Sequence, residues 1–377
     1  MGLIYLNNAA TSYPKPEIVK KVYMDALDSL PSGQFRSAGI ADNSDIFGTC
    51  RKRLASLMGI AEAERIYFTS GSTEGLNAII AGLKLKADQV ITTVTEHNSV
   101  LRPLYNLPGI KGEPALLPCD ENGYVEPELF EKTASSGKYR AVILNHCSNV
   151  TGAIQDVKAF GEIAGKHGLI FILDASQSAG CLDIRADEWG VDALAFTGHK
   201  SIMGVQGTGG YYVRQGLSFT PLKYGGTGLD SSRVVYENEE YEYEVGTQNA
   251  PGIAALSSAV EWVLSQGIDK ISDKERVLCE HLIKGLSSVN GVRVIGQEPV
   301  SRGPVVSFIT EGFAPSDMAY ILQNSYGIVT RAGLHCAPLI HKHIGSGDKG
   351  TLRVSFSYFN TEEDIEALLT VLREILA

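Results

Sequence analysis

The sequence predicts an α/β protein built on a mostly parallel sheet, with a smaller α+β domain toward its C-terminal end. Up to about residue 250, continuous runs of Val, Ile and Leu alternate with segments of helical spacing. Strands that are apolar along their whole length are buried on both faces, which is typical of parallel sheets covered by helices. Beyond that point, amphipathic helices are followed by short strands, which indicates a second packing unit.

The elements of the first unit follow from its apolar runs and the turns between them. Strands are expected at residues 66–68, 89–93, 141–144, 169–173, 193–196 and 209–213. Helices are expected at residues 73–83 and 157–167. This alternation favours strands joined by helical crossovers, and hence a parallel sheet.

The second unit reads as two long helices, three short strands and a final helix. The long helices are expected at residues 251–266 and 272–286, and the strands at 292–295, 305–309 and 352–356. The final helix, over 365–375, follows a capping signal in which Thr361 precedes three acidic residues. The sequence contains no internal repeat, low-complexity tract or long linker.

The composition argues against a nucleic-acid-binding, membrane or secreted protein. The 377 residues are 44% hydrophobic and 20% charged, as in an ordinary globular protein, and the net charge of −10 argues against nucleic acid or an anionic membrane as a partner. No apolar run is long enough to span a bilayer, and the N-terminus lacks the pattern of a signal peptide. The six cysteines are scattered without a C-x-x-C pair, which favours reduced thiols in the cytoplasm over a disulfide framework or a zinc site.

Polar residues gather where the predicted strands end, and ligands of parallel sheets bind at that edge. Ser72 and Thr73 lie between a strand and a helix, in the run Ser-Gly-Ser-Thr-Glu-Gly. Free amides at a helix N-terminus, together with hydroxyls and glycines, can hold a phosphate. An ordinary capped helix start is an equally good interpretation of this motif alone.

A lysine and an acid follow two of these strands. Thr197-Gly198-His199-Lys200 follows the strand at 193–196, and Asp174 ends the strand at 169–173. A lysine that forms a Schiff base, with a carboxylate for a pyridinium nitrogen, is what pyridoxal 5'-phosphate (PLP) requires. A surface lysine is the alternative for this run taken alone, whereas a buried acid must have a partner.

Three further side chains are candidates at strand ends. His97 could stack on a flat heteroaromatic ring, although a surface histidine is the more frequent case. Asn149 and Gln177 offer amides, although each alone most often belongs to a turn.

The loop over residues 331–337, Arg-Ala-Gly-Leu-His-Cys-Ala, combines three reactive residue types in the second unit. Its Arg331 and His335 are basic neighbours that could favour a thiolate at Cys336. A buried structural cysteine is the usual alternative.

Taken together, these motifs resemble the class V aminotransferase family of fold-type I PLP enzymes, and within it the cysteine desulfurases of the second, selenocysteine-lyase-like group. Six blocks match in order, at residues 4–11, 70–77, 96–98, 148–152, 174–200 and 331–337, and Arg353 follows them. The resemblance implies the fold-type I architecture, with a seven-stranded large domain at residues 15–250. It also implies a small α+β domain made of residues 1–14 and 251–377, carrying the Cys336 loop and Arg353.

The resemblance further implies roles for individual residues around PLP. Lys200 would form the Schiff base and move protons, Asp174 would keep the pyridine nitrogen protonated, and His97 would stack on the ring. Asn149 and Gln177 would bond the phenolic side of the ring. The phosphate would be held by Ser72, Thr73, Thr197 and His199, together with Thr227 from the partner subunit of a homodimer.

By the same resemblance, the substrate is L-cysteine or L-selenocysteine. Arg353 would bind its carboxylate, and Asn8, Arg331 and His335 would lie beside it. Cys336 would take the sulfur as a persulfide while L-alanine leaves, and a sulfur-acceptor protein could then receive it. Selenocysteine lyase, another class V reaction such as transamination or epimerisation, and an inactive scaffold are the alternatives.

The sequence departs from the family pattern at three places. Asn7 stands where the opening block usually has Asp, and Leu334 precedes His335 where many relatives have a second His. Residues 32–37 also differ from the substrate-side loop of relatives. These departures concern the choice of substrate more than the cofactor or the fold.

Overall fold

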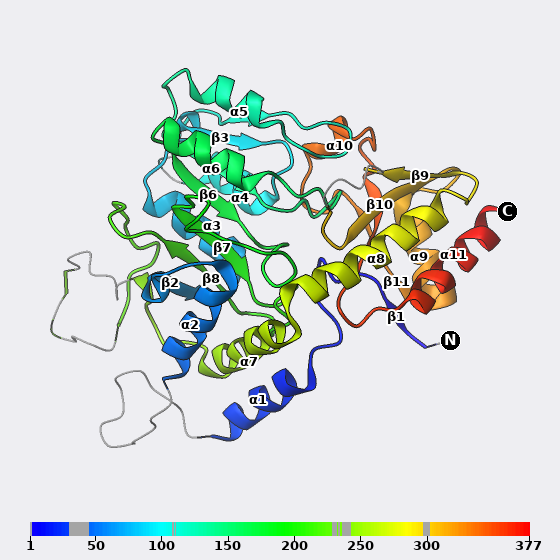
Figure 1. The fold of residues 1–377 in the computed structure, drawn as a ribbon, viewed down its shortest axis with the longest axis horizontal. Helices are drawn as coiled ribbons and strands as arrows, with labels where there is room; N and C mark the ends of the chain where they lie inside the picture. The colour runs from blue at the N-terminus through cyan, green and yellow to red at the C-terminus, as the bar shows by residue number, and fades with distance from the viewer. Residues whose placement is uncertain are drawn as a thin grey trace.

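The computed structural model describes residues 2–29, 45–107, 109, 111–227, 232, 234–235, 243–296 and 302–377. Residues 32–37, where the sequence departs from its relatives, lie outside the described residues. In Figure 1, the larger sheet and the helices that pack on it fill the left part of the view. The smaller sheet and its helices lie in the right part, near both termini.

The larger unit is built on a seven-stranded sheet, as expected. Its order is β2 (Ile66–Thr69), β8 (Gly209–Val213), β7 (Ala193–Thr197), β6 (Ile170–Asp174), β5 (Ala141–Asn145), β3 (Val90–Thr93) and β4 (Ala115–Leu117). Strand β8 runs antiparallel to both of its neighbours, and the other pairs are parallel. The parallel strands therefore end at one edge of the sheet.

Helices cover both faces of this sheet, because alternate residues of each strand point to opposite sides. In β5, Val142 and Leu144 join one apolar cluster and Ala141 and Ile143 join another. The first cluster includes residues of α2 (Ile46–Met58), α5 (Pro127–Ala134), α6 (Val157–Lys166) and α7 (Ala250–Gln266). The second includes residues of α3 (Ser72–Gly82) and α4 (Asn98–Asn106).

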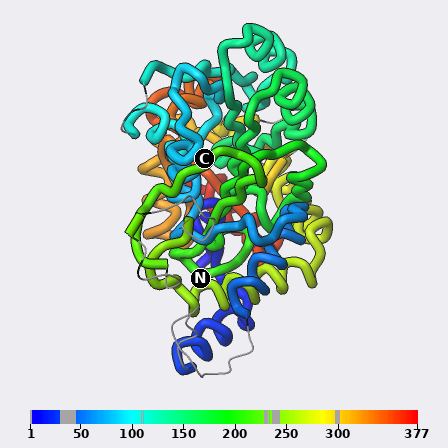
Figure 2. Tube along the Cα trace, turned by 90° about the vertical axis from the view of Figure 1, so that its left-hand side faces the viewer, coloured from blue at the N-terminus to red at the C-terminus, as the bar shows by residue number. Residues whose placement is uncertain are grey.

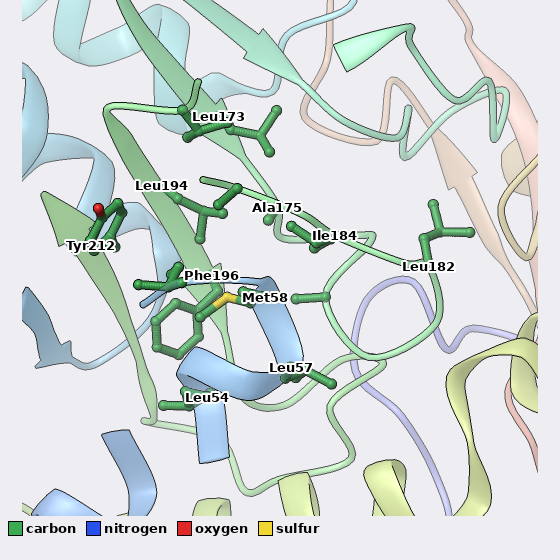
Figure 3. Packing of buried hydrophobic residues seen from close by; sticks show 14 of the residues in the cluster. Leu54, Leu57, Met58, Leu173, Ala175, Leu182, Ile184, Leu194, Phe196 and Tyr212 are labelled. Carbon is green, nitrogen blue, oxygen red and sulfur yellow. The ribbon is translucent and has the colours of Figure 1, made fainter. Parts of the chain in front are cut away.

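Helix α2 shows how one such face is filled. Its Leu54, Leu57 and Met58 belong to the same apolar cluster as Phe196 and Leu194 of the sheet, and Figure 3 shows Met58 beside the Phe196 ring. The helix starts at Asp45, whose side chain accepts a hydrogen bond from the Gly48 amide, and ends at a left-handed glycine. Caps at both ends fix its length, so that its apolar face matches the sheet.

The smaller unit is a four-stranded sheet with helices on one side. Its order is β12 (Arg331–Gly333), β13 (Thr351–Ser355), β10 (Val305–Thr310) and β9 (Val292–Ile295). Its helices are α8 (Ile268–Leu286), α9 (Pro315–Tyr326) and α11 (Glu362–Leu376). The chain start joins this unit, because β1 (Ile4–Tyr5) pairs with β11 (Ile328–Val329).

The change between the two cores lies along α8 rather than at residue 250. The buried side chains of α7, such as Leu256 and Val260, pack in the first cluster with the larger unit. Along α8, Ile271 still belongs to that cluster, whereas Leu278 and Leu282 belong to the core of the smaller sheet. Helix α7 thus packs with the larger unit, because its apolar face meets α1 and α2.

Most predicted elements agree with the structure to within a few residues, and the capping box at Thr361 and Asp364 is present. The sequence analysis did not identify the short strands β1, β4, β11 and β12 or six of the helices: α1 (Glu17–Asp28), α2, α4, α5, α9 and α10 (Ile340–His343). The short strands contain two or three residues each, too few for a periodic signal. Figure 2 shows the chain start lying close to later segments of the chain, contacts that no local pattern encodes.

Gly161 tests the packing of α6 against the loop before β7. A methyl group at this buried position would overlap the carbonyl oxygen of Trp189, and backbone cannot move aside cheaply. We expect Gly161→Ala to lower the free energy of unfolding by about 1–3 kcal/mol, as overpacking does. A lower melting temperature of the purified protein would show this effect.

Gly165→Ala, on the same helix, is the matched control. A methyl group there meets no atom within 4 Å, so the change should raise helix stability by up to about 1 kcal/mol. Equal melting temperatures for the two variants would contradict the close approach at Gly161.

Candidate active site

The polar strand ends meet in a cavity of about 300 Å³ at the carboxyl edge of the larger sheet. Strands β5, β6 and β7 contribute Asn145, Asp174 and Thr197 at their last positions. Arg331 and Arg353 reach the same cavity from the smaller sheet. The lining also contains Ser72, Thr73, His97, Asn149, Gln177, His199 and Lys200.

The N-terminus of α3 forms one wall of this cavity. No side chain caps this helix, and Ser72 is its first residue. The first amides of a helix have no acceptor within the helix, and its N-terminus carries partial positive charge. With the hydroxyls of Ser72 and Thr73 in the same wall, this end of α3 can bind an anion such as phosphate.

His199 lies in the lining beside Lys200 and keeps one polar atom without a partner. Its buried Nδ1 has no hydrogen bond among the described residues. Burial, with the positive charges of Lys200 and Lys15, lowers the pKa of His199 to about 4, so the ring is neutral. A neutral imidazole can still donate one hydrogen bond to an anion in the cavity.

Lys200 lines a cavity that disfavours positive charge. Burial lowers the pKa of Lys200 to about 8, Asp174 acts to raise it, and Arg353 and Arg331 lower it further. An amine with a pKa near neutrality is a usable nucleophile and base, because a larger fraction is unprotonated.

A strap from the start of the chain fixes the backbone around Lys200. The Ser12 hydroxyl donates to the Lys200 carbonyl at 2.8 Å. The carbonyl of His199 accepts from the Ser12 amide at 2.9 Å, the Lys15 ammonium at 3.0 Å and the Thr11 hydroxyl at 3.2 Å. Four donors on two adjacent carbonyls hold this turn in one orientation.

Asp174 is a buried carboxylate with a local partner. It accepts hydrogen bonds from the Ser176 amide at 2.9 Å and from the Ser176 hydroxyl. Burial raises the pKa of Asp174, while these bonds and the charge of Lys200 act to lower it. A cation within the cavity would therefore be stabilised by this carboxylate.

His97 caps α4 and lies between two cavities. Its Nδ1 accepts from the Ser99 amide at 3.0 Å and lies 2.8 Å from the Ser99 hydroxyl. Burial and the charge of Lys200 lower the pKa of His97 to about 3. The ring is thus neutral and oriented by Ser99, as a stacking surface requires.

Cys336 lines the neighbouring cavity, of about 320 Å³, rather than the first one. Thr73, His97 and Ser99 line both cavities, so the thiol lies just beyond the wall of the first. The guanidinium of Arg331 is 3.5 Å from its sulfur atom. The fold therefore places the Cys336 thiol next to the cavity that contains Lys200, with the positive charge of Arg331 beside the sulfur.

The backbone at Cys336 is strained and tied to the larger unit. His335 and Cys336 both have left-handed φ angles, 51° and 60°, which cost energy in residues other than glycine. The Asn98 amide donates to the Cys336 carbonyl at 2.7 Å, and the Asn149 side chain donates to the His335 carbonyl at 2.7 Å. These bonds hold the loop against the sheet edge.

Besides Cys336, three predicted residues are absent from the described lining of the first cavity. Asn8 uses its side chain within the fold, donating to the Ser355 carbonyl at 3.0 Å and to Asn360 at 3.1 Å. His335 is buried against Thr351, 2.9 Å from its hydroxyl. Thr227 is absent from the described lining of the cavity.

The sequence analysis missed several residues that shape the site. Ser176 and Ser99 orient Asp174 and His97, and each follows its partner by two residues, a spacing that could have indicated a local bond. The strap residues Ser12 and Lys15 gave no comparable signal, because the residues that they hold lie far along the chain.

Lys200 gives a test that needs no cofactor. In the cofactor-free protein, acetylation of Lys200 by acetic anhydride should reach half its maximal rate near pH 8, because only the neutral amine reacts. An ordinary lysine would do so near pH about 10.4. Asp174→Asn removes the carboxylate that raises this pKa, so the midpoint should move to lower pH. Mass spectrometry of the Lys200 peptide measures both curves.

Asp183→Asn is the control, since that carboxylate lies on the surface in an ion pair with Arg185 and should leave the midpoint unchanged. A midpoint near 10 in the unmodified protein, or an upward shift in Asp174→Asn, would contradict the charge arrangement described for this cavity.

Comparisons with known proteins agree with this geometry. The Aminotransferase class-V family model matches residues 4–368. A "Probable cysteine desulfurase" of Pyrococcus abyssi is 32% identical over 99% of this chain and 94% of its own, and one of Methanothermobacter thermautotrophicus is 33% identical over 86% and 82%. The apo structure of a cysteine desulfurase from Thermococcus onnurineus NA1 is similar with a TM-score of 0.91 and 30% identity, over 99% of this chain and 94% of that one. This chain belongs to the aminotransferase class-V family.

Proposed function

We propose that this protein is a PLP-dependent cysteine desulfurase, which converts L-cysteine to L-alanine and takes the sulfur onto Cys336 as a persulfide. One observation carries the proposal: a thiol with a guanidinium 3.5 Å away lies beside a cavity that contains Lys200 and Asp174. The relatives named as cysteine desulfurases support the same reaction.

The donor set of the cavity fits PLP. The uncapped end of α3 with Ser72 and Thr73, and the unpartnered Nδ1 of His199, suit its phosphate. Asp174 suits the ring nitrogen, and Lys200 suits the aldehyde. When bound, PLP withdraws electrons from the Cα atom of the amino acid attached to it.

The other residues bind and orient the substrate. His97 offers a neutral ring for stacking, and Asn149 and Gln177 offer amides in the same lining. The buried guanidinium of Arg353 suits the substrate carboxylate, because charge-assisted bonds to a carboxylate can be bidentate. Arg331 in the same lining keeps a positive charge beside the Cys336 sulfur.

In the proposed reaction, Lys200 transfers the protons and Cys336 accepts the sulfur. Lys200 takes the Cα proton of the substrate and returns a proton to carbon. The Cys336 thiolate attacks the substrate sulfur, so that a sulfur–sulfur bond forms as the carbon–sulfur bond breaks. Overall, L-cysteine and the Cys336 thiol give L-alanine and a Cys336 persulfide, which an acceptor thiol can then take up.

We further propose that the protein is a homodimer and that it is located in the cytoplasm. A homodimer would let Thr227 complete the phosphate site of the partner subunit, which fits its position away from the described lining of its own cavity. All six cysteines are free, which fits a cytoplasmic enzyme. No helix in the described part of the chain is long and apolar enough to cross a membrane.

Product analysis tests the function as a whole. The PLP-loaded protein should release L-alanine from L-cysteine, and Lys200→Ala should lose this activity. Formation of a keto acid in place of alanine would assign the chain to a transaminase instead.

Cys336→Ala tests the role of the thiol. The variant should lose nearly all alanine production from L-cysteine, because burial raises the pKa of Cys147, the thiol in the cavity lining, to about 12 and so keeps it protonated. It should retain much of the production from L-selenocysteine, whose carbon–selenium bond is weaker. In the unmodified enzyme, mass spectrometry after brief incubation with L-cysteine should find one added sulfur atom on the Cys336 peptide.

Cys119→Ala is the matched control, because Cys119 is also a partly exposed free thiol. It should keep both activities. Desulfuration of L-cysteine at an unchanged rate by Cys336→Ala would refute the persulfide role.

A further inference from the structure

Arg353 has an environment that is unusual for a buried cation. It lies in the middle of β13, and its side chain is fully buried. Its guanidinium donates to two neutral oxygens, from Nη1 to the Asn149 carbonyl at 2.9 Å and from Nη2 to the Asn7 side-chain oxygen at 3.1 Å. Its Nε is buried and has no partner among the described residues.

The charges around Arg353 add to this imbalance. Arg331 lies directly opposite it on β12, and both side chains line the same cavity. Burial first, and then repulsion by Arg331, lower the pKa of Arg353 to about 9, and Cys336 and Tyr5 act in the opposite direction. Within the described ranges of the chain, no carboxylate forms an ion pair with Arg353.

Asn7 occupies the place from which a carboxylate would neutralise Arg353. Its position is fixed, because its backbone bridges to Ser355 beside the last strand of the small sheet. Asparagine and aspartate have nearly the same shape, so a carboxylate here could make the same contact with a full negative charge. An unpaired buried cation costs stability, whereas a paired one binds a second anion less strongly.

We propose that Asn7 is a specificity-determining residue, whose neutral amide orients Arg353 without neutralising it and so reserves the guanidinium for the carboxylate of an amino-acid substrate. The inference deepens the proposed function and rests on it. The free enzyme carries an uncompensated cation, and the substrate carboxylate is the group that compensates it. The neutral Asn7 thus leaves the substrate-free enzyme less stable and makes its affinity for the substrate carboxylate higher.

Asn7→Asp in the PLP-loaded enzyme separates these two effects, because they have opposite signs. The new ion pair should raise the melting temperature of the substrate-free enzyme. It should weaken binding of L-alanine, measured as Kd by calorimetry, at least about tenfold, the effect of one pKa unit of charge interaction. The KM for L-cysteine should rise with it while kcat changes little, as expected for lost binding in ground and transition states alike.

Asn7→Ala and Asn324→Asp are the matched variants. Asn7→Ala removes the oxygen without adding charge, so its Kd for L-alanine should stay within about threefold of the unmodified enzyme, because the guanidinium stays unneutralised and keeps its orienting bond to the Asn149 carbonyl. Asn324→Asp adds the same charge on the exposed part of α9 and should change none of these quantities. Should Asn7→Asp fail to fold, Asn7→Ala still decides: a tenfold loss there would overturn the role of charge.

Arg353→Ala distinguishes this inference from the proposed function. If Arg353→Ala retains the affinity for L-alanine, then Arg353 does not bind the carboxylate, and both that part of the proposed function and the role of Asn7 are wrong. If Arg353→Ala loses it but Asn7→Asp keeps Kd and KM unchanged, only the role of Asn7 is wrong.

Discussion

Burial of the larger sheet on both faces is the constraint on which the site depends. Apolar layers on either side leave no room for unpaired polar groups within the strands, so such groups can gather only where the strands end. Asn145, Asp174 and Thr197 occupy the last positions of three adjacent strands. The same helices that bury the sheet supply the uncapped N-terminus of α3 beside them.

The cavity at this edge collects more positive than negative charge from its lining. Lys200, Arg331 and Arg353 share the lining with Asp174 and with Glu74, whose carboxylate is already paired with Lys223, and burial together with mutual repulsion lowers the pKa of Lys200 and of Arg353. Such a site gains most from anionic ligands, because each one restores charges that the empty site disfavours. A phosphate at α3 and a carboxylate at Arg353 are complementary to this field, and both belong to the proposed reaction.

The smaller unit supplies the thiol and holds it at the boundary between the two cores. Cys336 lies just after β12, and β12 pairs with β13, which carries Arg353. The same small sheet therefore positions both the sulfur of Cys336 and the guanidinium of Arg353. The left-handed turn at His335 and Cys336 is kept by bonds from Asn98 and Asn149 of the larger unit. Strain of this kind persists only where surrounding contacts over-determine it, and here those contacts join the two units directly at the site.

The sequence by itself determined the strand ends, the lysine, its acid and the Cys336 loop, since apolar runs and the polar residues after them are local signals. It could not indicate the strap of Ser12 and Lys15 on His199, the opposition of Arg331 and Arg353, or the contact of Asn7 with Arg353. The last pair is separated by 346 positions along the chain. Only tertiary packing decided these contacts, because each depends on how distant strands pair and not on any preference of the residues themselves.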